Sequence, residues 1–148
     1  MKYQIYIFQK EKEEKFFRRA IDEYKKRLTR YCSISVKYLK RERDWEKLKQ
    51  SVGSRDMAFV LGAGPSDLSS EGLAARIREL ENHGVRTLHF FIPSGNVGQE
   101  DVADGYGECR AEWLSLSDFT MPPQMTGMIL SEQIYRAYRI LNNQPYHK

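Results

Sequence analysis

Hydrophobic positions recur along this chain with two alternating periods. Short apolar runs, rich in β-branched and aromatic residues, predict strands at residues 3–8, 33–39, 57–61, 87–92 and 113–116. Apolar residues at three- and four-residue steps predict helices at residues 11–31, 41–50, 70–84, 100–106 and 125–142. Alternating strands and helices predict a single α/β domain over residues 1–148, with a mostly parallel sheet flanked by helices.

Three loops follow predicted strands, and in parallel sheets ligands gather at the carboxyl ends of the strands. These loops lie at residues 62–66, 93–99 and 117–124. Gly62 and Gly64 resemble the start of a dinucleotide-binding turn, but Asp67 occupies the place of its third glycine. A phosphate-binding P-loop motif is also absent from the sequence. The two glycines are therefore interpreted as turn residues.

The charges are divided unevenly along the chain. Residues 1–50 hold 16 Lys and Arg against 8 Asp and Glu, although the net charge of the whole chain is only +4. A basic front half suits a polyanion such as RNA, because cationic side chains release counterions when they neutralise phosphates. The alternative is a solvated helix with ion pairs such as Glu11–Lys15, Glu14–Arg18 and Glu23–Arg27. Charge alone leaves both interpretations open.

Several classes of protein are not favoured by the sequence. No apolar run is long enough to cross a bilayer, and residues 1–8 do not resemble a signal peptide, so a cytoplasmic protein is expected. Cys32 and Cys109 are far apart and form no metal-ligand motif, which predicts two free thiols. His83 and His89 lack metal-ligand spacing, so we expect no metal site and a structural role for both. A hydrolase is also not favoured, because no G-x-S-x-G motif occurs.

An ordered series of motifs occupies the last thirty-five residues. It reads LSLS at residues 114–117, FTMP at 119–122, EQIYRA at 132–137 and PYHK at 145–148. In order and spacing, this series resembles the RlmH (YbeA-like) family of SPOUT-class knotted methyltransferases, which act on ribosomal RNA of the large subunit. The first strand and the LSSEGLA segment at residues 68–74 also resemble that family, so the similarity covers the whole chain.

The resemblance implies a carboxyl-terminal trefoil knot, a homodimer and S-adenosylmethionine as cofactor. It implies methyl transfer to ring nitrogen 3 of a pseudouridine in 23S ribosomal RNA, with ribosomal RNA or the ribosome as partner. By position, Arg136, Tyr146 and His147 would belong to the catalytic and RNA-facing set. The cofactor would be bound by Leu61, Gly95, Ser117, Asp118, Phe119, Thr120, Met121 and Pro122. Arg136 could stabilise the anion that develops on a uracil-type imide, and Tyr146 or His147 could move its proton.

Two departures from the family pattern lie at the proposed site. Pro93 and Ser94 stand where the family usually has two glycines, and Pro123 and Gly127 stand where it usually has histidine and arginine. These departures motivate an alternative function, a catalytically impaired paralogue that acts as a non-catalytic RNA- or ribosome-binding knotted dimer. A third hypothesis is a small-ligand-binding protein with an altered pocket.

Overall fold

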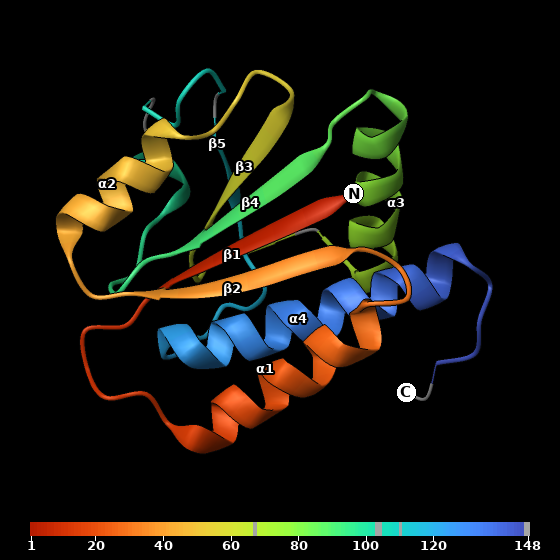
Figure 1. Cartoon of the computed structure of the whole chain (residues 1–148), viewed down its shortest axis with the longest axis horizontal. Helices are drawn as coiled ribbons and strands as arrows, with labels where there is room; N and C mark the ends of the chain where they lie inside the picture. The colour runs from red at the N-terminus through yellow and green to blue at the C-terminus, as the bar shows by residue number, and fades with distance from the viewer. Residues whose placement is uncertain (67, 103–104, 110, 147–148) are drawn as a thin grey trace.

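A single five-stranded sheet forms the centre of the molecule. The computed structural model describes residues 1–66, 68–102, 105–109 and 111–146. The strands are β1 (Lys2–Phe8), β2 (Ser33–Leu39), β3 (Asp56–Leu61), β4 (Thr87–Ile92) and β5 (Ala111–Leu114). They lie in the order β2-β1-β4-β3-β5, and every neighbouring pair is parallel (Figure 1). The mostly parallel α/β sheet is therefore confirmed, whereas the trefoil knot and the single-domain assignment stay predictions.

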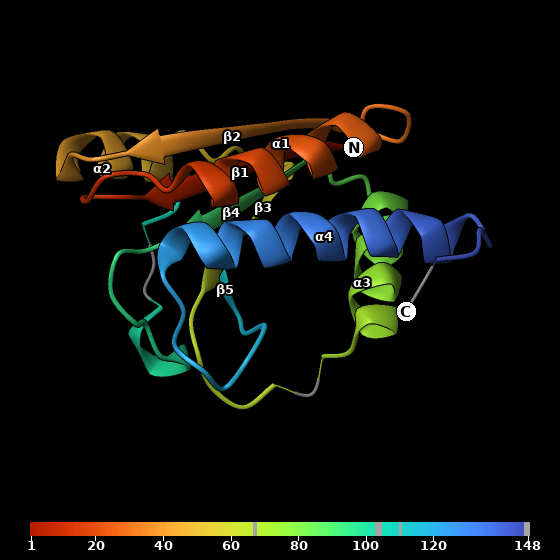
Figure 2. The same cartoon turned by 90° about the horizontal axis from the view of Figure 1, so that it is seen from below.

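Helices cover both faces of this sheet unequally. They are α1 (Lys15–Leu28), α2 (Glu42–Gln50), α3 (Ser70–Asn82) and α4 (Pro123–Leu141). Figures 1 and 2 show α1, α3 and α4 on one face and α2 on the other. Because side chains alternate along a strand, Ile5 and Ile7 of β1 join the core under α1, α3 and α4, whereas Tyr6 and Phe8 join the core under α2.

The ends of α3 follow the local sequence signals. The Ser69 side chain accepts a hydrogen bond from the Gly72 N–H at 3.0 Å, which satisfies one of the free donors at the helix start. Gly84 lies just past the helix with φ +83°, a conformation that glycine adopts without steric cost. The predicted start of this helix at residue 70 is confirmed, and its last residue, Asn82, lies two residues before the predicted end.

Two other predicted helices differ from the structure. α1 begins at Lys15 rather than at residue 11, because the Glu14 backbone is bonded to the Gln124 side chain of α4. The helix predicted at residues 100–106 does not form at residues 100–102, 105 and 106, the part of this range that the structure describes. These residues contribute a 3-10 turn, η1 (Gln99–Asp101), and Gly105 takes a φ of +117° that does not continue a helix.

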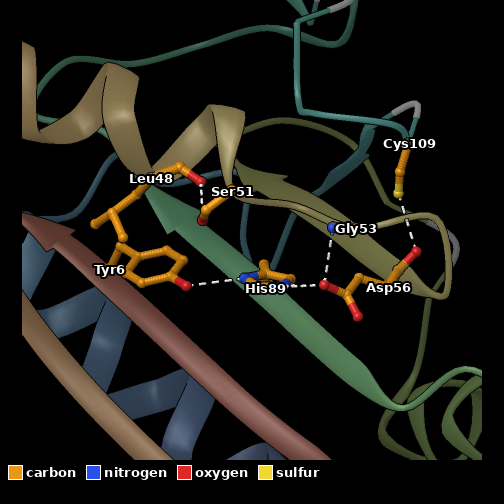
Figure 3. Close-up of polar contacts among 7 residues, drawn as sticks. All are labelled: Tyr6, Leu48, Ser51, Gly53, Asp56, His89 and Cys109. Carbon is orange, nitrogen blue, oxygen red and sulfur yellow. Dashed lines mark hydrogen bonds and ion pairs between the residues drawn. The ribbon is translucent and has the colours of Figure 1, made fainter.

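A chain of polar contacts crosses the sheet on the face covered by α2 (Figure 3). His89 of β4 contacts the Tyr6 hydroxyl through Nδ1 at 2.8 Å and the Asp56 carboxylate through Nε2 at 2.9 Å. Asp56 also accepts from the Gly53 N–H at 3.0 Å, and its carbonyl accepts from the Cys109 thiol. His89 is thus a satisfied buried side chain that links three adjacent strands. Cys32 and Cys109 are both free thiols, as predicted.

Candidate functional site

A pocket opens where β3 and β4 end. Its walls come from the turn after β3, the turn after β4 and the segment between β5 and α4, and Thr126 on the first turns of α4 closes one side. Its cavity measures about 170 Å³. The pocket is lined by Leu61, Gly62, Ala63, Ile92, Pro93, Ser94, Gly95, Asn96, Leu116, Ser117, Phe119, Thr120, Met121 and Thr126. All three loops singled out in the sequence therefore meet at one place.

Two of the three walls are bonded to each other. The Asn96 side chain, in the turn after β4, accepts from the N–H of Ala63, in the turn after β3, at 2.8 Å. The indole of Trp113, in β5, donates to the Val97 carbonyl at 2.8 Å. A Cβ at Gly62 would lie 1.8 Å from the Val97 oxygen and 2.5 Å from Trp113 Nε1. Glycine at position 62 is therefore required for the turns after β3 and β4 to approach this closely.

The third wall is anchored at its start. Gly64 donates its N–H to the Ser117 carbonyl at 3.1 Å, and the Ser115 hydroxyl contacts the carbonyls of Gly64 and Ser117 at 2.6 and 3.0 Å. The Ser117 hydroxyl accepts from the Phe119 N–H at 2.9 Å, which turns the chain. After this turn the Phe119 side chain is 81% exposed, so a large apolar ring stands free beside the pocket.

Six of the eight residues predicted to bind the cofactor line this pocket: Leu61, Gly95, Ser117, Phe119, Thr120 and Met121. Asp118 is exposed, and Pro122 directly precedes α4; neither lines the cavity. Sequence reasoning missed Gly62, Asn96 and Thr126. Gly62 was interpreted as a simple turn residue, and only its contacts with a distant turn reveal its part in the pocket wall.

Arg136 lies on the outer side of α4, nearer its carboxyl end. Its Nε donates to the Glu132 carboxylate at 2.8 Å, and the Tyr146 ring lies 4.3 Å from its guanidinium carbon. The hydrogen bond to Glu132 is the main reason that the pKa of Arg136 is raised above its ordinary value. Arg136 therefore stays positively charged at physiological pH.

Tyr146 is held against the same helix. Its ring centroid lies 5.4 Å from that of Tyr135. The pKa of Tyr146 is raised to about 12, mainly because the side chain is buried and secondly because of the negative charge of Glu132. At neutral pH this phenol keeps its proton and can donate a hydrogen bond. His147, the third predicted catalytic residue, lies outside the described residues.

The pocket and the Arg136 cluster are at different places on α4. Thr126 reaches the pocket, and Arg136 lies ten residues later on the same helix. At 1.5 Å per residue this separates them by about 15 Å along the helix axis. One chain thus brings together the predicted cofactor residues, and separately Arg136 with Tyr146, but it does not join the two groups.

Of the four residues that depart from the family pattern, Gly127 and Pro123 have local structural explanations. Pro93 and Ser94 both line the pocket. A Cβ at Gly127 would lie 2.6 Å from Cδ1 of Ile7, because α4 packs directly on β1 there. The glycine thus occupies a position without room for a long side chain. Pro123 is the first residue of α4, where proline is well tolerated because the N–H has no partner within the helix.

Comparison with known proteins places this chain in a family. A family model described as "Predicted SPOUT methyltransferase" matches residues 1–147. The chain belongs to the SPOUT methyltransferase family. SPOUT methyltransferases use S-adenosylmethionine in general, so the family membership implies this cofactor.

Curated relatives in the SPOUT family match nearly the whole chain. A Thermoanaerobacter sp. (strain X514) protein named "Ribosomal RNA large subunit methyltransferase H 1" is 38% identical over 100% of both chains. Proteins named "Ribosomal RNA large subunit methyltransferase H" from Clostridioides difficile and Bifidobacterium animalis subsp. lactis are 36% and 40% identical. Each of these two matches covers 91% of this chain and 92% of the relative.

Among residues 1–66, 68–102, 105–109 and 111–146, no cluster of three or more His, Cys, Asp or Glu side chains is placed to hold a metal ion. Within the same described part of the chain, no helix combines the length and the apolar character needed to span a membrane.

Proposed function

We propose that this protein is an S-adenosylmethionine-dependent methyltransferase of 23S ribosomal RNA, with ring nitrogen 3 of a pseudouridine as the methyl acceptor. One observation carries the proposal. The chain matches a relative named as a ribosomal RNA large subunit methyltransferase along 100% of both lengths. No feature of the described residues favours the non-catalytic alternative.

The residues of the pocket fit this cofactor. Apolar side chains of Leu61, Ile92, Leu116 and Met121 suit an adenine ring, and the hydroxyls of Ser117, Thr120 and Thr126 suit ribose and amino-acid groups. The cavity of about 170 Å³ is smaller than the roughly 300 Å³ at which small-molecule sites begin. Part of the cofactor would therefore lie against the open side of the pocket, next to Phe119. When bound, the cofactor supplies an electrophilic methyl group on its sulfonium.

Arg136 and Tyr146 supply the electrostatics for the acceptor base. An imide nitrogen must lose its proton before or during methyl transfer, and negative charge then spreads over the ring. Arg136, fixed by Glu132, provides a permanent positive charge for that anion. Because its pKa is about 12, Tyr146 acts as a hydrogen-bond donor rather than as the base. Removal of the imide proton then falls to another group, and His147 is the residue proposed for it.

The active site is proposed to be shared between two copies of the chain. About 15 Å along α4 separate the pocket from Arg136, too far for one chain to present both to a single methyl group. A two-fold dimer brings the pocket of one protomer to the Arg136 and Tyr146 of its partner. The outer side of α4 near the pocket carries the half-buried Met125 and Ile129, which suit such an interface.

The decisive experiment is transfer of a labelled methyl group to ribosomes that lack the modification. The wild type is expected to transfer the label and R136A to lose most of this activity. Failure of the wild type on both ribosomes and free ribosomal RNA contradicts the proposal. Cofactor binding is measured separately by calorimetry, where T126W, which fills the pocket, should weaken binding at least about tenfold and T126A should not.

A complementation experiment tests the shared site. R136A and T126W are each expected to be inactive alone, but their co-expression yields mixed dimers. Each mixed dimer has one complete site if the pocket and Arg136 come from different protomers, so about a quarter of wild-type activity returns. If both come from the same chain, mixing restores nothing.

A further inference from the structure

One side of α1 carries cations that have no role in the proposed reaction. Lys15, Arg19 and Lys26 lie in α1, and Arg30 lies in the turn that follows it. At 100° per residue, these four positions share the side of the helix opposite the buried Ile21. All four side chains are exposed. We call this set the α1 basic stripe; it extends over roughly 22 Å.

The acidic residues of the segment do not neutralise the stripe. Glu13 pairs with Arg18 at 2.5 Å and Glu23 pairs with Arg27 at 3.1 Å, so both are committed to other cations. The Glu11–Lys15 and Glu14–Arg18 pairs expected for a helix starting at residue 11 do not form among the described residues.

Asp22 and Glu23 both lie on the exposed side of α1. Glu23 is paired with Arg27, so Asp22 offsets one of the four positive charges. No ion pair between the stripe and an acidic side chain occurs among the described residues. Of the two interpretations of the basic front half, a surface for an external polyanion therefore fits this helix better than an ion-paired solvated face.

The stripe is connected to the proposed acceptor site. α1 and α4 lie side by side on the same face of the sheet and run in the same direction (Figure 2). Between them, the Arg27 guanidinium lies 5.6 Å from the Tyr24 ring and 5.8 Å from the Tyr135 ring. Tyr135 in turn packs on Tyr146, beside Arg136. Aromatic and guanidinium groups thus lie between α1, the helix that carries the stripe, and the residues proposed to bind the acceptor base.

We propose that the α1 basic stripe binds the phosphate backbone of the RNA substrate. The inference rests on the proposed function for the identity of the RNA, but it assigns a separate surface with a separate role. Phosphates held along α1 position the strand without reading its bases, whereas unstacked bases fit the tyrosines and arginines between α1 and α4. The stripe thus sets affinity and orientation, and takes no part in methyl transfer.

The test compares two variants with the same change in net charge. K15Q/R19Q/K26Q/R30Q removes the stripe. R43Q/K47Q/R55Q/R86Q removes four exposed cations from α2 and from the loops before β3 and β4, and none of these four forms an ion pair within the described residues. Binding to a 23S ribosomal RNA fragment is measured between about 50 and 200 mM salt, because each phosphate contact lowers log K with log salt by about 0.7 to 0.9.

The stripe variant should reduce the salt slope by about 3 and weaken binding by roughly 10- to 100-fold, and the control variant should change both far less. For the stripe variant, the KM for RNA should rise, while kcat and the affinity for the cofactor stay near the wild-type values. Equal effects in both variants, or an unchanged slope in the stripe variant, overturn the inference. If the wild type binds RNA with the expected salt slope but transfers no methyl group, the proposed function is contradicted, whereas the proposal that the stripe binds RNA still stands.

Discussion

Arg136 directs two nitrogens of its guanidinium at one oxygen of Glu132, with Nε at 2.8 Å and Nη2 at 2.7 Å. Both side chains are about four-fifths buried, at 22% and 18% exposure, so solvent screens this ion pair less than a surface pair. Gln133 donates to the other oxygen of Glu132 at 3.2 Å. Glu132 is thus held on both sides, and it fixes the direction in which Arg136 points.

We predict that Glu132 is a positioning residue for Arg136. E132Q should lower kcat about tenfold, because charge stabilisation by Arg136 loses its fixed geometry, while cofactor affinity stays unchanged. E132D should recover part of the rate. Since Glu132 also contributes to the raised pKa of Tyr146, E132Q should move the phenolate titration of that residue to lower pH. An unchanged kcat together with an unchanged titration would refute the prediction.

Gly62 should tolerate no side chain. G62A places a Cβ against the Val97 carbonyl and the Trp113 indole, and is expected to lower the free energy of unfolding by about 2 to 3 kcal/mol. Gly95 lines the same pocket, but a Cβ there meets no atom within 4 Å, so G95A should cost far less stability. Chemical denaturation of both variants checks this, and equal losses would mean that the contact with Val97 is unimportant.

Gly127 and Ile7 should be energetically coupled. G127A brings a Cβ to 2.6 Å from Cδ1 of Ile7, and I7V removes that atom. Alone, I7V should cost about 0.5 to 1.5 kcal/mol. Combined with I7V, G127A should gain from the better helix propensity of alanine, so the double variant is expected to be more stable than the sum of the single effects. Strict additivity in a double-mutant cycle would contradict this packing.

Tyr6 should contribute to stability in a pH-dependent way. The pKa of Tyr6 is raised from 10.0 to about 12, mainly because the side chain is buried and secondly because of the charge of Asp56. The folded state holds this proton more tightly than the unfolded state, so the contribution is fully present below pH 10 and is lost as pH rises towards 12. The loss should reach roughly 2 kcal/mol.

The Y6F variant isolates this effect from the other tyrosines. It lacks the hydroxyl that contacts His89 (Figure 3), so it should be less stable than the wild type at about pH 8. The difference between the two proteins should narrow by about pH 11. A difference that stays constant across this range would show that the Tyr6 proton is not held more tightly in the folded state.

The sequence predicted the order and type of nearly all elements, because each depends on periodicity within a short segment. Its failures depend on contacts between distant segments. The start of α1 is decided by Gln124, 110 residues away from Glu14, and no local pattern at residues 11–15 reports that bond. Against the helix predicted after residue 100, which the described residues of that range do not form, the sequence offered a local signal in Gly105 and Gly107, both of which take positive φ.

The candidate site was predictable to different degrees. The pocket followed from general rules for parallel sheets together with the family motifs, since both point to loops after strands. Arg136 and Tyr146 came from the motif series, and the structure brings them into contact with each other. The distance of Arg136 and Tyr146 from the pocket was not predictable from the sequence, because it depends on which residues of α4 line the cavity. The need for glycine at position 62 also depended on Val97, which lies in another turn.

The bond from Ala63 to Asn96 joins the turns after β3 and β4, and Trp113 of β5 holds the second of these turns through Val97. The remaining wall of the pocket, residues 118–121, is held mainly at Ser117. We therefore expect substitutions in this four-residue segment to alter the dissociation rate of a bound ligand more than they alter equilibrium selectivity among related ligands.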